Sequence, residues 1–334
     1  MIPVITASNR RAHRSLWAII FILSGCSMGG HEQISEPTDH PLLGKIWDAR
    51  TGNFIEYDLL KGQAAQARHL LLGETHINPE HHRIQAEVIG DLLDEGQSFA
   101  LVMEIFETDQ QQAIDLATSD DRATADKVAD ATGVRNSGWD WDSYRPLIQL
   151  GLEGNAPILA GNAPRKEVRQ VAYAGLEAVP SDRITELGLS TPLPAASRQT
   201  LTQVIIDSHC GHALGDMADR LVDAQRVRDA TMADVMLTAP SDKSVLITGA
   251  GHARRDYGVP RYILERTPDA TVVSIGLTEV TTGLTSPEDY VQRVAGEDIP
   301  FDYLWFTERA MFEDPCEKFR ESLKTLGDHG QKAD

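Results

Sequence analysis

Two stretches with the spacing Gly-x-x-His each follow a short apolar run in this sequence. Residues 73–76 (GETH) follow RHLLL, and residues 249–252 (GAGH) follow SVLIT. Neutral imidazoles and carboxylates are ligands for zinc, iron and manganese, and a carboxylate can also act as a general base on a metal-bound water. The residue types in the two stretches therefore suit a binding or catalytic site with metal chemistry.

Polar side chains follow two further apolar runs in the same way. Glu104 comes after FALVM, and Asn162 comes after PILA and one glycine. In a parallel sheet the carboxyl ends of the strands lie along one edge, and ligands bind in the crevice outside that edge. We therefore expect Glu104 and Asn162 to join Glu74, His76 and His252 in one groove. The alternative is that these are ordinary turn residues at strand ends.

The elements that would position these residues alternate between short apolar runs and longer helical patterns. Continuous apolar strands separated by helices predict an α/β fold, with a mainly parallel β-sheet flanked by α-helices. The expected strands are 68–72, 99–103, 157–160, 244–248 and 271–275, after a hairpin within 44–60. Two long helical stretches, near 105–155 and 176–240, are expected to form a small inserted helical subdomain beside the groove.

Several common catalytic motifs are absent from the sequence. It contains no HExxH, no Cys-x-x-Cys and no Gly-x-Ser-x-Gly, which argues against ordinary zinc proteases and serine hydrolases. Residues 249–251 (GAG) are followed by Arg254 where a dinucleotide-binding loop needs a small residue, so this is not a Rossmann fingerprint.

The segment after His76 predicts a helix start. Asn78 would be the N-cap, and Pro79 would occupy the first helical position. His81 and His82 then lie in the first turn of the helix, close to the expected groove. Either histidine could line the groove, or both could only pack the helix.

Two further clusters allow a binding or a structural interpretation. Residues 208–212 (SHCGH), with His209, Cys210 and His212, could bind a soft metal or haem iron, or could be an irregular join between two helices. In residues 139–145 (WDWDSYR), Tyr144 could be a phenolate ligand to ferric iron, and Arg145 could pair with a carboxylate. The structural alternative for this cluster is a helix start packed on the sheet.

The N-terminus has the pattern of an export signal. Three arginines precede the apolar run LWAIIFILSG, which is too short for a comfortable membrane span. The sequence LSGC at its end resembles a bacterial lipobox, so residues 1–25 are expected to be cleaved and Cys26 to carry lipid. Residues 26–42 would be a tether, and Ser27 favours the outer membrane of a Gram-negative bacterium, with the folded body facing the periplasm.

The charge and cysteine content narrow the range of partners. Removing residues 1–25 takes away three arginines and changes the formal net charge from −19 to −22. Such an acidic chain is not expected to bind nucleic acid or the surface of anionic lipids. Cys210 and Cys316 remain after lipidation of Cys26, and two cysteines do not predict a disulfide.

Six blocks of the sequence together resemble the ChaN family of haem-binding uptake lipoproteins, within the wider TIKI superfamily. They lie within roughly residues 66–276, in the order LLGETHINPEHHRIQAEVI, LVMEIF, WDSYRPLIQLGLEGNAPILAGNAPR, SHCGH, AQRVRDATMA and ITGAGHARRDYGVP. The resemblance implies an α/β domain over residues 43–310, followed by a polar tail at 311–334. It also implies haem or iron binding, often at a homodimer interface, by a lipid-anchored protein of iron acquisition.

The resemblance also suggests roles for particular residues. Tyr144, Tyr257 and Tyr262 are candidate iron ligands near matched blocks. The residues expected to line the haem groove are Glu74, His76, His82, Glu104, Tyr144, Arg145, Asn162 and His252. The alternative function is a metal-dependent peptidase or esterase, in which His76 and His252 hold a divalent metal ion and Glu74 and Glu104 are catalytic.

Overall fold

The computed structural model describes residues 39–119, 122–211, 215–291, 299–310 and 316. The expected signal peptide, the lipidation site Cys26, most of the tether and nearly all of the tail lie outside the described residues. Within the described part of the chain, no helix is long and apolar enough to span a membrane.

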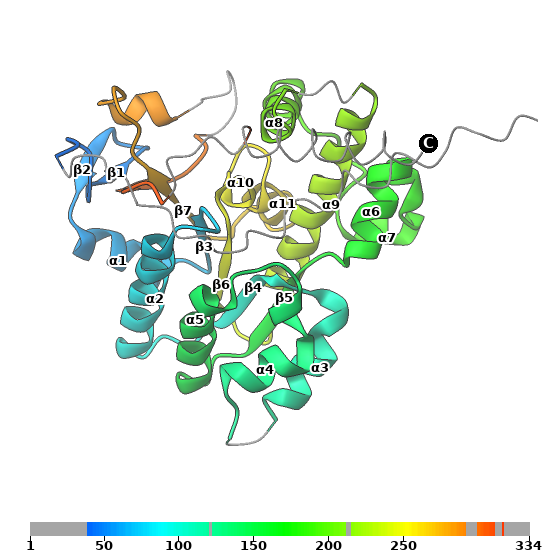
Figure 1. The fold of residues 1–334 in the computed structure, drawn as a ribbon, viewed down its shortest axis with the longest axis horizontal. Coiled ribbons are helices and arrows are strands. Elements are labelled where there is room, and N and C mark those ends of the chain that lie inside the picture. Colours follow the sequence, from blue (N-terminus) through cyan, green and yellow to red (C-terminus); the bar gives the residue numbers. More distant parts are fainter. Residues whose placement is uncertain (1–38, 120–121, 212–214, 292–298, 311–315, 317–334) are drawn as a thin grey trace, which may run out of the picture.

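One mixed sheet of eight strands runs through the described chain (Figure 1), in the order β2-β1-β8-β7-β3-β6-β4-β5. The neighbours from β8 to β5 pair in parallel, and β1 pairs antiparallel with both β2 and β8. This confirms the predicted α/β class and the mainly parallel sheet. The strands are β1 (Ile46–Asp48), β2 (Asn53–Ile55), β3 (His69–Glu74), β4 (Ala100–Glu107), β5 (Ile158–Asn162), β6 (Ser244–Gly249), β7 (Val272–Glu279) and β8 (Tyr303–Thr307).

The central strands are buried on both faces, which explains why their sequences are continuous apolar runs rather than alternating ones. In β3, Leu70 and Leu72 belong to one core and Leu71 to the other. Because successive side chains of a strand point to opposite faces, each strand contributes to both layers of core. Helices must therefore cover the sheet on both sides.

Five of the described helices pack on the face of Leu70 and Leu72, and Figure 1 shows α1, α2 and α5 together on this side. They are α1 (Tyr57–Gln66), α2 (Pro79–Asp94), α3 (Gln111–Ala117), α4 (Ala125–Thr132) and α5 (Trp141–Glu153). Helix α2 begins where the sequence predicted, because the side chain of Asn78 accepts the backbone N–H groups of Glu80 and His81 and Pro79 opens the first turn.

The opposite face is covered mainly by α9, with α6 and α11 packed beside it. The helices after β5 are α6 (Arg165–Ala174), α7 (Ser181–Glu186), α8 (Ala195–Ser208), α9 (Met217–Leu237), α10 (Ala250–Ala253) and α11 (Val259–Arg266). Short 3-10 helices lie at η2 (Thr108–Gln110), η3 (Val134–Asn136), η4 (Leu176–Ala178) and η5 (Pro287–Tyr290). The stretches 105–155 and 176–240 therefore contain α3 to α5 and α7 to α9.

One strand has no counterpart in the sequence prediction. β8 lies between β7 and β1, and it attaches the N-terminal hairpin to the rest of the sheet. Its residues, Tyr303–Thr307, are all buried. The other strands were predicted from the alternation of apolar runs with helical patterns. No helical pattern precedes β8, so this alternation does not predict it.

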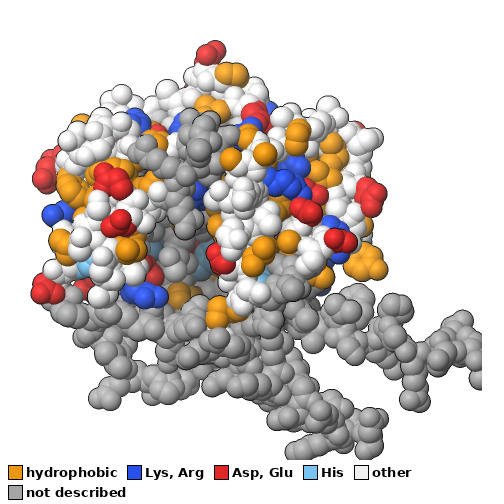
Figure 2. Space-filling model, turned by 90° about the horizontal axis from the view of Figure 1, so that it is seen from above, with side chains coloured by type: hydrophobic (Ala, Val, Ile, Leu, Met, Phe, Trp, Pro, Cys, Tyr) orange, Lys and Arg blue, Asp and Glu red, His pale blue; other side chains and the backbone are white. Residues whose placement is uncertain are grey.

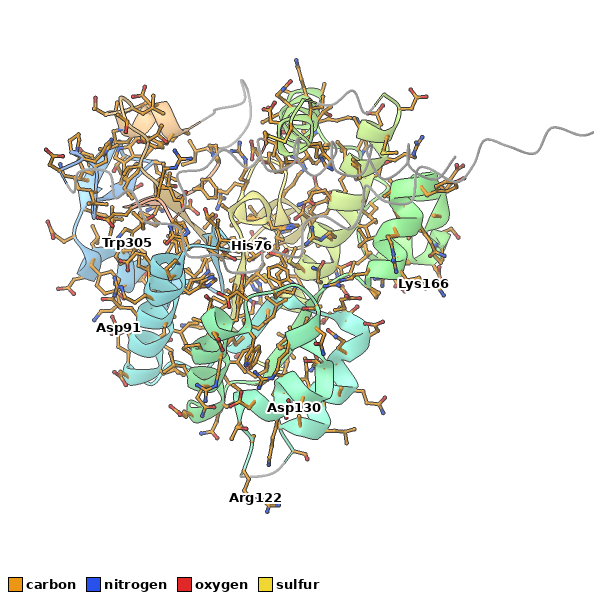
Figure 3. The ribbon with its side chains drawn as sticks, in the orientation of Figure 1. His76, Asp91, Arg122, Asp130, Lys166 and Trp305 are labelled. Atoms are coloured by element: carbon orange, nitrogen blue, oxygen red, sulfur yellow. A yellow bond between two sulfur atoms is a disulfide. The ribbon has the colours of Figure 1, made fainter. Side chains whose placement is uncertain are left out.

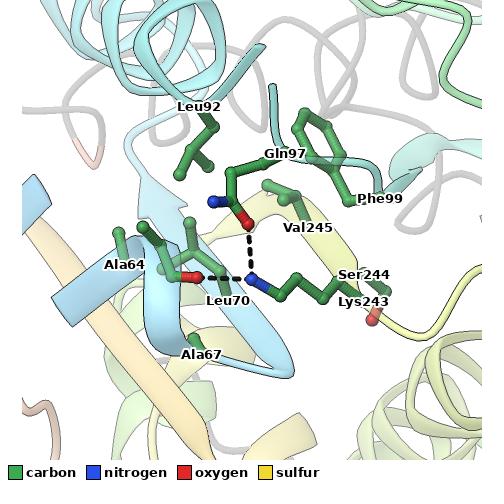
Figure 4. Close-up of a pocket in the computed structure, with 10 residues that line it drawn as sticks. Ala64, Ala67, Leu70, Leu92, Gln97, Phe99, Lys243, Ser244 and Val245 are labelled. Carbon is green, nitrogen blue, oxygen red and sulfur yellow. Dashed lines mark hydrogen bonds between the residues drawn. The ribbon is translucent and has the colours of Figure 1, made fainter. Parts of the chain in front are cut away.

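The amino-terminal edge of the sheet carries no cluster of ligating side chains in the described residues that line it. Figure 4 shows a small cavity there, where the ammonium group of Lys243 donates to the carbonyl of Ala65 and to the side chain of Gln97. Its lining is otherwise mostly aliphatic, with Phe99 and Leu70 among the members. The polar side chains that could do chemistry lie at the opposite, carboxyl edge.

Candidate functional site at the carboxyl edge of the sheet

The alternation of side chains along the strands divides the candidate site into two halves. In β3, the side chain of Glu74 lies on the same face as those of Leu70 and Leu72, so it points towards α5. In β4, Glu104 follows Met103 and so points to the opposite face, towards α9. Both carboxylates are buried, with 3% and 2% of each residue exposed. Each becomes the centre of its own hydrogen-bonded group.

The first half, on the α5 face, is built around Glu74. Its Oε1 atom accepts Nδ1–H of His76 at 2.5 Å and the hydroxyl of Tyr144 at 2.8 Å. The ring of Trp139 meets the ring of His76 edge-on, with 4.6 Å between centroids. These contacts fix the orientation of the imidazole, because its Nδ1 proton must face the carboxylate.

His76 is the exposed member of this half, with 44% of its side chain accessible. Burial lowers the pKa of its imidazole, but the hydrogen bond to Glu74 and the charges of Glu74 and Glu104 outweigh that effect and raise the pKa above its ordinary value. Figure 3 labels His76 near the middle of the molecule, where the central strands end. Figure 2 looks onto the molecule from above and shows a hollow with histidine side chains in its wall.

The second half, on the α9 face, is built around Glu104. Its Oε2 atom accepts the hydroxyl of Thr248 and the backbone N–H of Gly249, both at 2.7 Å. Its Oε1 atom accepts Nη2 of Arg228 at 2.6 Å, and Nε of Arg228 donates to Asn162 Oδ1 at 3.0 Å. Although burial would raise the pKa of Glu104, the charges of His252, Arg228 and His76 hold it well below its ordinary value.

His252 is enclosed between two carboxylates in this half. Its Nδ1–H donates to Asp229 Oδ1 at 2.5 Å, and its Nε2 lies 3.4 Å from Glu104 Oε1. The amide nitrogen of Gln225 lies 3.0 Å from Nδ1 and 3.1 Å from Nε2. Burial would lower the pKa of His252, but Glu104 and Asp229 outweigh it and raise the pKa to about 9. Burial raises the pKa of Asp229.

The two halves meet at Gly249, the last residue of β6. A Cβ atom at this position would lie 2.9 Å from Cε1 and 3.2 Å from Nε2 of His76, and 3.7 Å from Oε2 of Glu104. The missing side chain therefore makes room for the imidazole of the first half beside the carboxylate of the second. This gives a physical reason for the glycine in the GAGH stretch.

The two histidines of the first turn of α2 are buried behind the site. His81 accepts the backbone N–H of Thr75 at Nδ1 and donates from Nε2 to Thr307, and burial lowers its pKa to about 3. Nε2 of His82 donates to the carbonyl of His76 at 3.1 Å, and its ring packs edge-on against Tyr144. Both side chains hold the GETH loop in place.

The structure places several other predicted site residues outside the two halves. Arg145 is half exposed on α5 and pairs with Asp126, because its helix turns it away from Glu74. Tyr257 and Tyr262 are buried, the first beneath the guanidinium of Arg254 and the second beside that of Arg226.

The SHCGH segment contains the turn at the end of α8. His209 donates from Nδ1 to the carbonyl of Ile205 at 2.7 Å. Cys210, with a positive φ of 59°, forms a disulfide with Cys316, with 5.4 Å between the Cα atoms. The sequence did not predict this pairing, and His212 lies outside the described residues.

Three residues of the site could not be assigned from the sequence, and all three, Gln225, Arg228 and Asp229, project from α9. Trp139, which precedes α5 and contacts His76, lies in the WDWDSYR cluster, for which the sequence allowed a binding role. The α9 residues lie within the block AQRVRDATMA, which stands out in the sequence only through the family resemblance. One sequence feature could have identified these α9 residues. Arg228 and Asp229 are adjacent charged residues in a helix that covers the edge of the sheet.

The possible ligands at this edge are the partly exposed imidazole of His76 and two groups of buried carboxylates, one around Glu74 and one around Glu104. Across the described ranges, no three His, Cys, Asp or Glu side chains are arranged to hold a metal ion. The divalent-metal alternative is therefore not supported, because both ring nitrogens of His252 already face protein atoms. Glu74 Oε2 and Asp229 Oδ2 are buried acceptors without a partner in the described chain.

Comparisons with known proteins agree with this fold. Residues 60–263 match the family described as "Haem-binding uptake, Tiki superfamily, ChaN". ChaN of Campylobacter jejuni, solved with cofacial haem, is similar in structure, with 20% sequence identity, a TM-score of 0.62 and coverage of 78% of this chain and 95% of that chain. A search of curated proteins found no match.

Two more distant structures are similar to part of the chain. The first is a type III effector, at 14% identity and a TM-score of 0.40, covering 75% of this chain and 92% of its own. The second is an erythromycin esterase mutant in its open conformation, at 15% identity and a TM-score of 0.38, covering 79% of this chain and 82% of its own.

Proposed function

This chain belongs to the ChaN family of haem-binding uptake proteins in the Tiki superfamily, and on that premise we propose that it binds haem at the carboxyl edge of its sheet. The observation that carries the proposal is the imidazole of His76. It is held at Nδ1 by a buried carboxylate, and 44% of its side chain is exposed. Nitrogen ligands of this kind suit haem iron.

The surroundings of His76 fit a large, flat, apolar ligand that carries carboxylates. Ile77, its neighbour in the chain, is 53% exposed, and the Trp139 ring packs against the imidazole. Arg228, whose side chain is 25% exposed and pairs with Glu104, supplies a cation in the second half of the site. An apolar surface with one imidazole and one cation matches the porphyrin ring, the iron and the propionates of haem.

A hemin titration of the purified full-length chain tests the proposal. We expect a shifted Soret band that saturates at stoichiometric haem and micromolar concentration. If no shifted band forms, or if the absorbance rises linearly without saturation, haem binding at a defined site is wrong.

We propose further that the protein is a lipid-anchored cell-envelope protein of iron acquisition. The proposed anchor is the lipidated thiol of Cys26, and the proposed location is the periplasmic side of the outer membrane. The sequence LSGC supports the anchor, and the disulfide between Cys210 and Cys316 suits an oxidising compartment. Cells given radiolabelled palmitate should label the wild-type protein, and Cys26→Ser should remove the label. Equal labelling of both proteins would contradict the anchor.

We also propose that two copies associate when haem is bound. The support for this is that Ile77 and His76, both exposed, lie together at the mouth of the site, so a bound ligand would extend an apolar surface there. Sedimentation velocity with and without one equivalent of hemin should show a dimer only in the loaded protein. A monomer in both samples would overturn this part of the proposal.

A further inference from the structure

We propose that this chain associates head to tail with further copies of itself, with an exposed tyrosine and two cations of one copy docked in an aromatic groove of the next. Neither surface belongs to the carboxyl-edge site. The contact is therefore separate from the proposed haem-dependent pairing, and it needs no haem.

The first surface is the outward face of α6. Its Tyr173 is 86% exposed, the highest value among the exposed large hydrophobic residues of the described chain. Lys166 and Arg169 lie seven and four residues earlier, so helical spacing places them on the same face as the tyrosine. Both are exposed, and neither forms an ion pair within the described ranges. The opposite face of α6 packs through Val171 into the core shared with α9. We call Lys166, Arg169 and Tyr173 the tyrosine stripe.

The composition of the tyrosine stripe indicates the chemistry of its partner. A single exposed apolar residue needs no partner. Here, however, an aromatic ring lies beside two unpaired cations, on a chain with a formal net charge of −19. Tyrosine and arginine contribute much of the binding energy at protein interfaces, and complementary charges select the partner. The stripe therefore suits a protein surface that combines an aromatic pocket with carboxylates.

The second surface is a groove of about 340 Å³ at the hairpin end of the sheet. Its apolar lining comes from β1, β2, β8 and the start of α1, with Ile46, Phe54, Ile55, Tyr57 and Trp305. Phe54 is 47% exposed, and Leu59, in the first turn of α1, is 54% exposed. Pockets that hold small ligands have volumes of roughly 300–1,000 Å³, so this aromatic groove can admit the side chain of one tyrosine.

Carboxylates outnumber cations at the aromatic groove. Glu56 lines it, and Asp58 follows in the first turn of α1, both exposed. The hydroxyl of Tyr57 donates to the carboxylate of Asp91 at 2.8 Å. Lys45 is the one cation in the lining, and its ammonium group lies over an aromatic ring of the groove. The groove thus offers the aromatic pocket and the negative charge that the tyrosine stripe requires.

The two surfaces lie at opposite ends of the sheet, which determines the geometry of the association. The groove includes β2, one edge strand, and α6 follows β5, the other edge strand. Figure 3 labels Trp305 of the groove and Lys166 of the stripe on opposite sides of the molecule. One contact between two copies therefore leaves a free groove on one copy and a free stripe on the other. A contact of this kind is heterologous and extends head to tail.

Sedimentation equilibrium of the full-length protein without hemin tests the association. A small interface binds weakly, so we expect monomers at micromolar concentration and a rising average mass at concentrations on the order of hundreds of micromolar. Added salt should lower the average mass again, because it screens the charges of the stripe and the groove.

Two variants test which surfaces meet. The stripe variant is Lys166→Ala/Arg169→Ala/Tyr173→Ala, and the groove variant is Glu56→Lys/Asp58→Lys. All five side chains are solvent-accessible, so each variant should keep the circular dichroism of the wild type. Each variant alone should stay monomeric, with an association constant lowered by roughly tenfold or more. An equimolar mixture should form dimers and stop there, because the intact groove of the first variant binds the intact stripe of the second.

The matched control is Leu116→Ala. It removes another strongly exposed side chain, 70% accessible on α3, that belongs to neither surface. Its average mass should rise with concentration as in the wild type.

The outcomes decide the proposal without reference to haem. A wild-type protein that stays monomeric over the whole concentration range overturns it. So does a folded stripe or groove variant that associates like the wild type, or a Leu116→Ala variant that associates as weakly as they do. A mixture of the two folded variants that stays monomeric, or that grows beyond dimers, overturns the pairing of stripe with groove.

Discussion

His252 lies between two buried acids, and its protonation is therefore coupled to folding. Asp229 holds Nδ1 at 2.5 Å, and Glu104 lies 3.4 Å from Nε2. If His252 were neutral, the buried negative charge of Glu104 would lose one of the positive charges that stabilise it. A buried charge without such a partner destabilises the folded protein. The protonated imidazole therefore stabilises the folded chain.

The first prediction concerns the pH dependence of this contribution. The pKa of His252 rises from 6.5 to about 9 on folding. Below pH 6.5 the imidazole is protonated in both states and the contribution is fully present. As pH rises through 9, the folded chain loses this proton and the contribution disappears. The expected loss is on the order of 3 kcal/mol of unfolding free energy.

Urea unfolding across the range from mildly acidic to alkaline pH measures this loss. His252→Asn removes the titrating group, so its unfolding free energy should vary much less across the same window. An equally steep decline in the variant would show that other groups cause it.

At the scale of single residues, the sequence predicted where the polar residues that follow the strands lie in the fold. Glu74, His76, Glu104, Asn162 and His252 do lie at one edge, because parallel strands end together. The partners from α9 could not be assigned, since the rotation of a helix over a sheet edge depends on tertiary packing. The same limit applies to Arg145, whose helix turns it towards Asp126.

Among the elements, the start of α2 secures the GETH loop. Asn78 is 2% exposed, caps the helix, and donates to Glu279 Oε1 at 2.7 Å and to the carbonyl of Glu308 at 2.9 Å. One side chain thus joins α2 to β7 and to the chain that follows β8.

The second prediction is that Asn78→Ala lowers the unfolding free energy by about 2 kcal/mol, because the helix loses its cap and the two part-buried hydrogen bonds of the Asn78 amide are lost as well. Thr124→Ala is the matched control, since Thr124 caps α4 on the surface through one bond to the backbone of Lys127. Its cost should be about 1 kcal/mol or less. Equal losses, measured by urea unfolding, would contradict the structural role of the Asn78 amide.

The third prediction compares two glycines. A Cβ atom at Gly73 would lie 2.7 Å from the Cβ of Ala253 and 3.0 Å from the Cα of Ala250, because α10 packs directly on β3. We expect Gly73→Ala to cost about 1–3 kcal/mol. A Cβ atom at Gly90, inside α2, would meet nothing within 4 Å, so Gly90→Ala should stabilise by about 0.5–1 kcal/mol. Thermal unfolding of both variants measures the difference, and a stabilised Gly73→Ala would contradict the close packing.

The strands with continuous apolar runs were predicted correctly because burial on both faces leaves a clear pattern. β3, for example, was expected at 68–72 and lies at His69–Glu74. β8 was missed because it pairs with the hairpin from the other end of the chain. Such long-range pairing leaves no local signal.

For the molecule as a whole, the disulfide joins positions 106 residues apart in the sequence. The fourth prediction is that Cys210→Ser/Cys316→Ser lowers stability by about 2–4 kcal/mol, because the unfolded chain regains the freedom of a long loop. The reductant dithiothreitol should lower the Tm of the wild-type protein and leave the Tm of the double variant unchanged. If the reductant has the same effect on both, the loss does not come from this bond.

The position of β8 between β1 and β7 has a consequence for the order in which the protein can be assembled. The hairpin of β1 and β2 is synthesised first, yet the strand that joins it to the rest of the described sheet is β8, the last of the described strands to be made. While the chain emerges from the ribosome or crosses a membrane, the edge of β1 that later pairs with β8 therefore stays unpaired. Exposed strand edges attract other strands. A truncated chain that ends before Tyr303 lacks β8, so this edge of β1 stays unpaired. Truncated chains are therefore expected to aggregate more readily than the full-length protein.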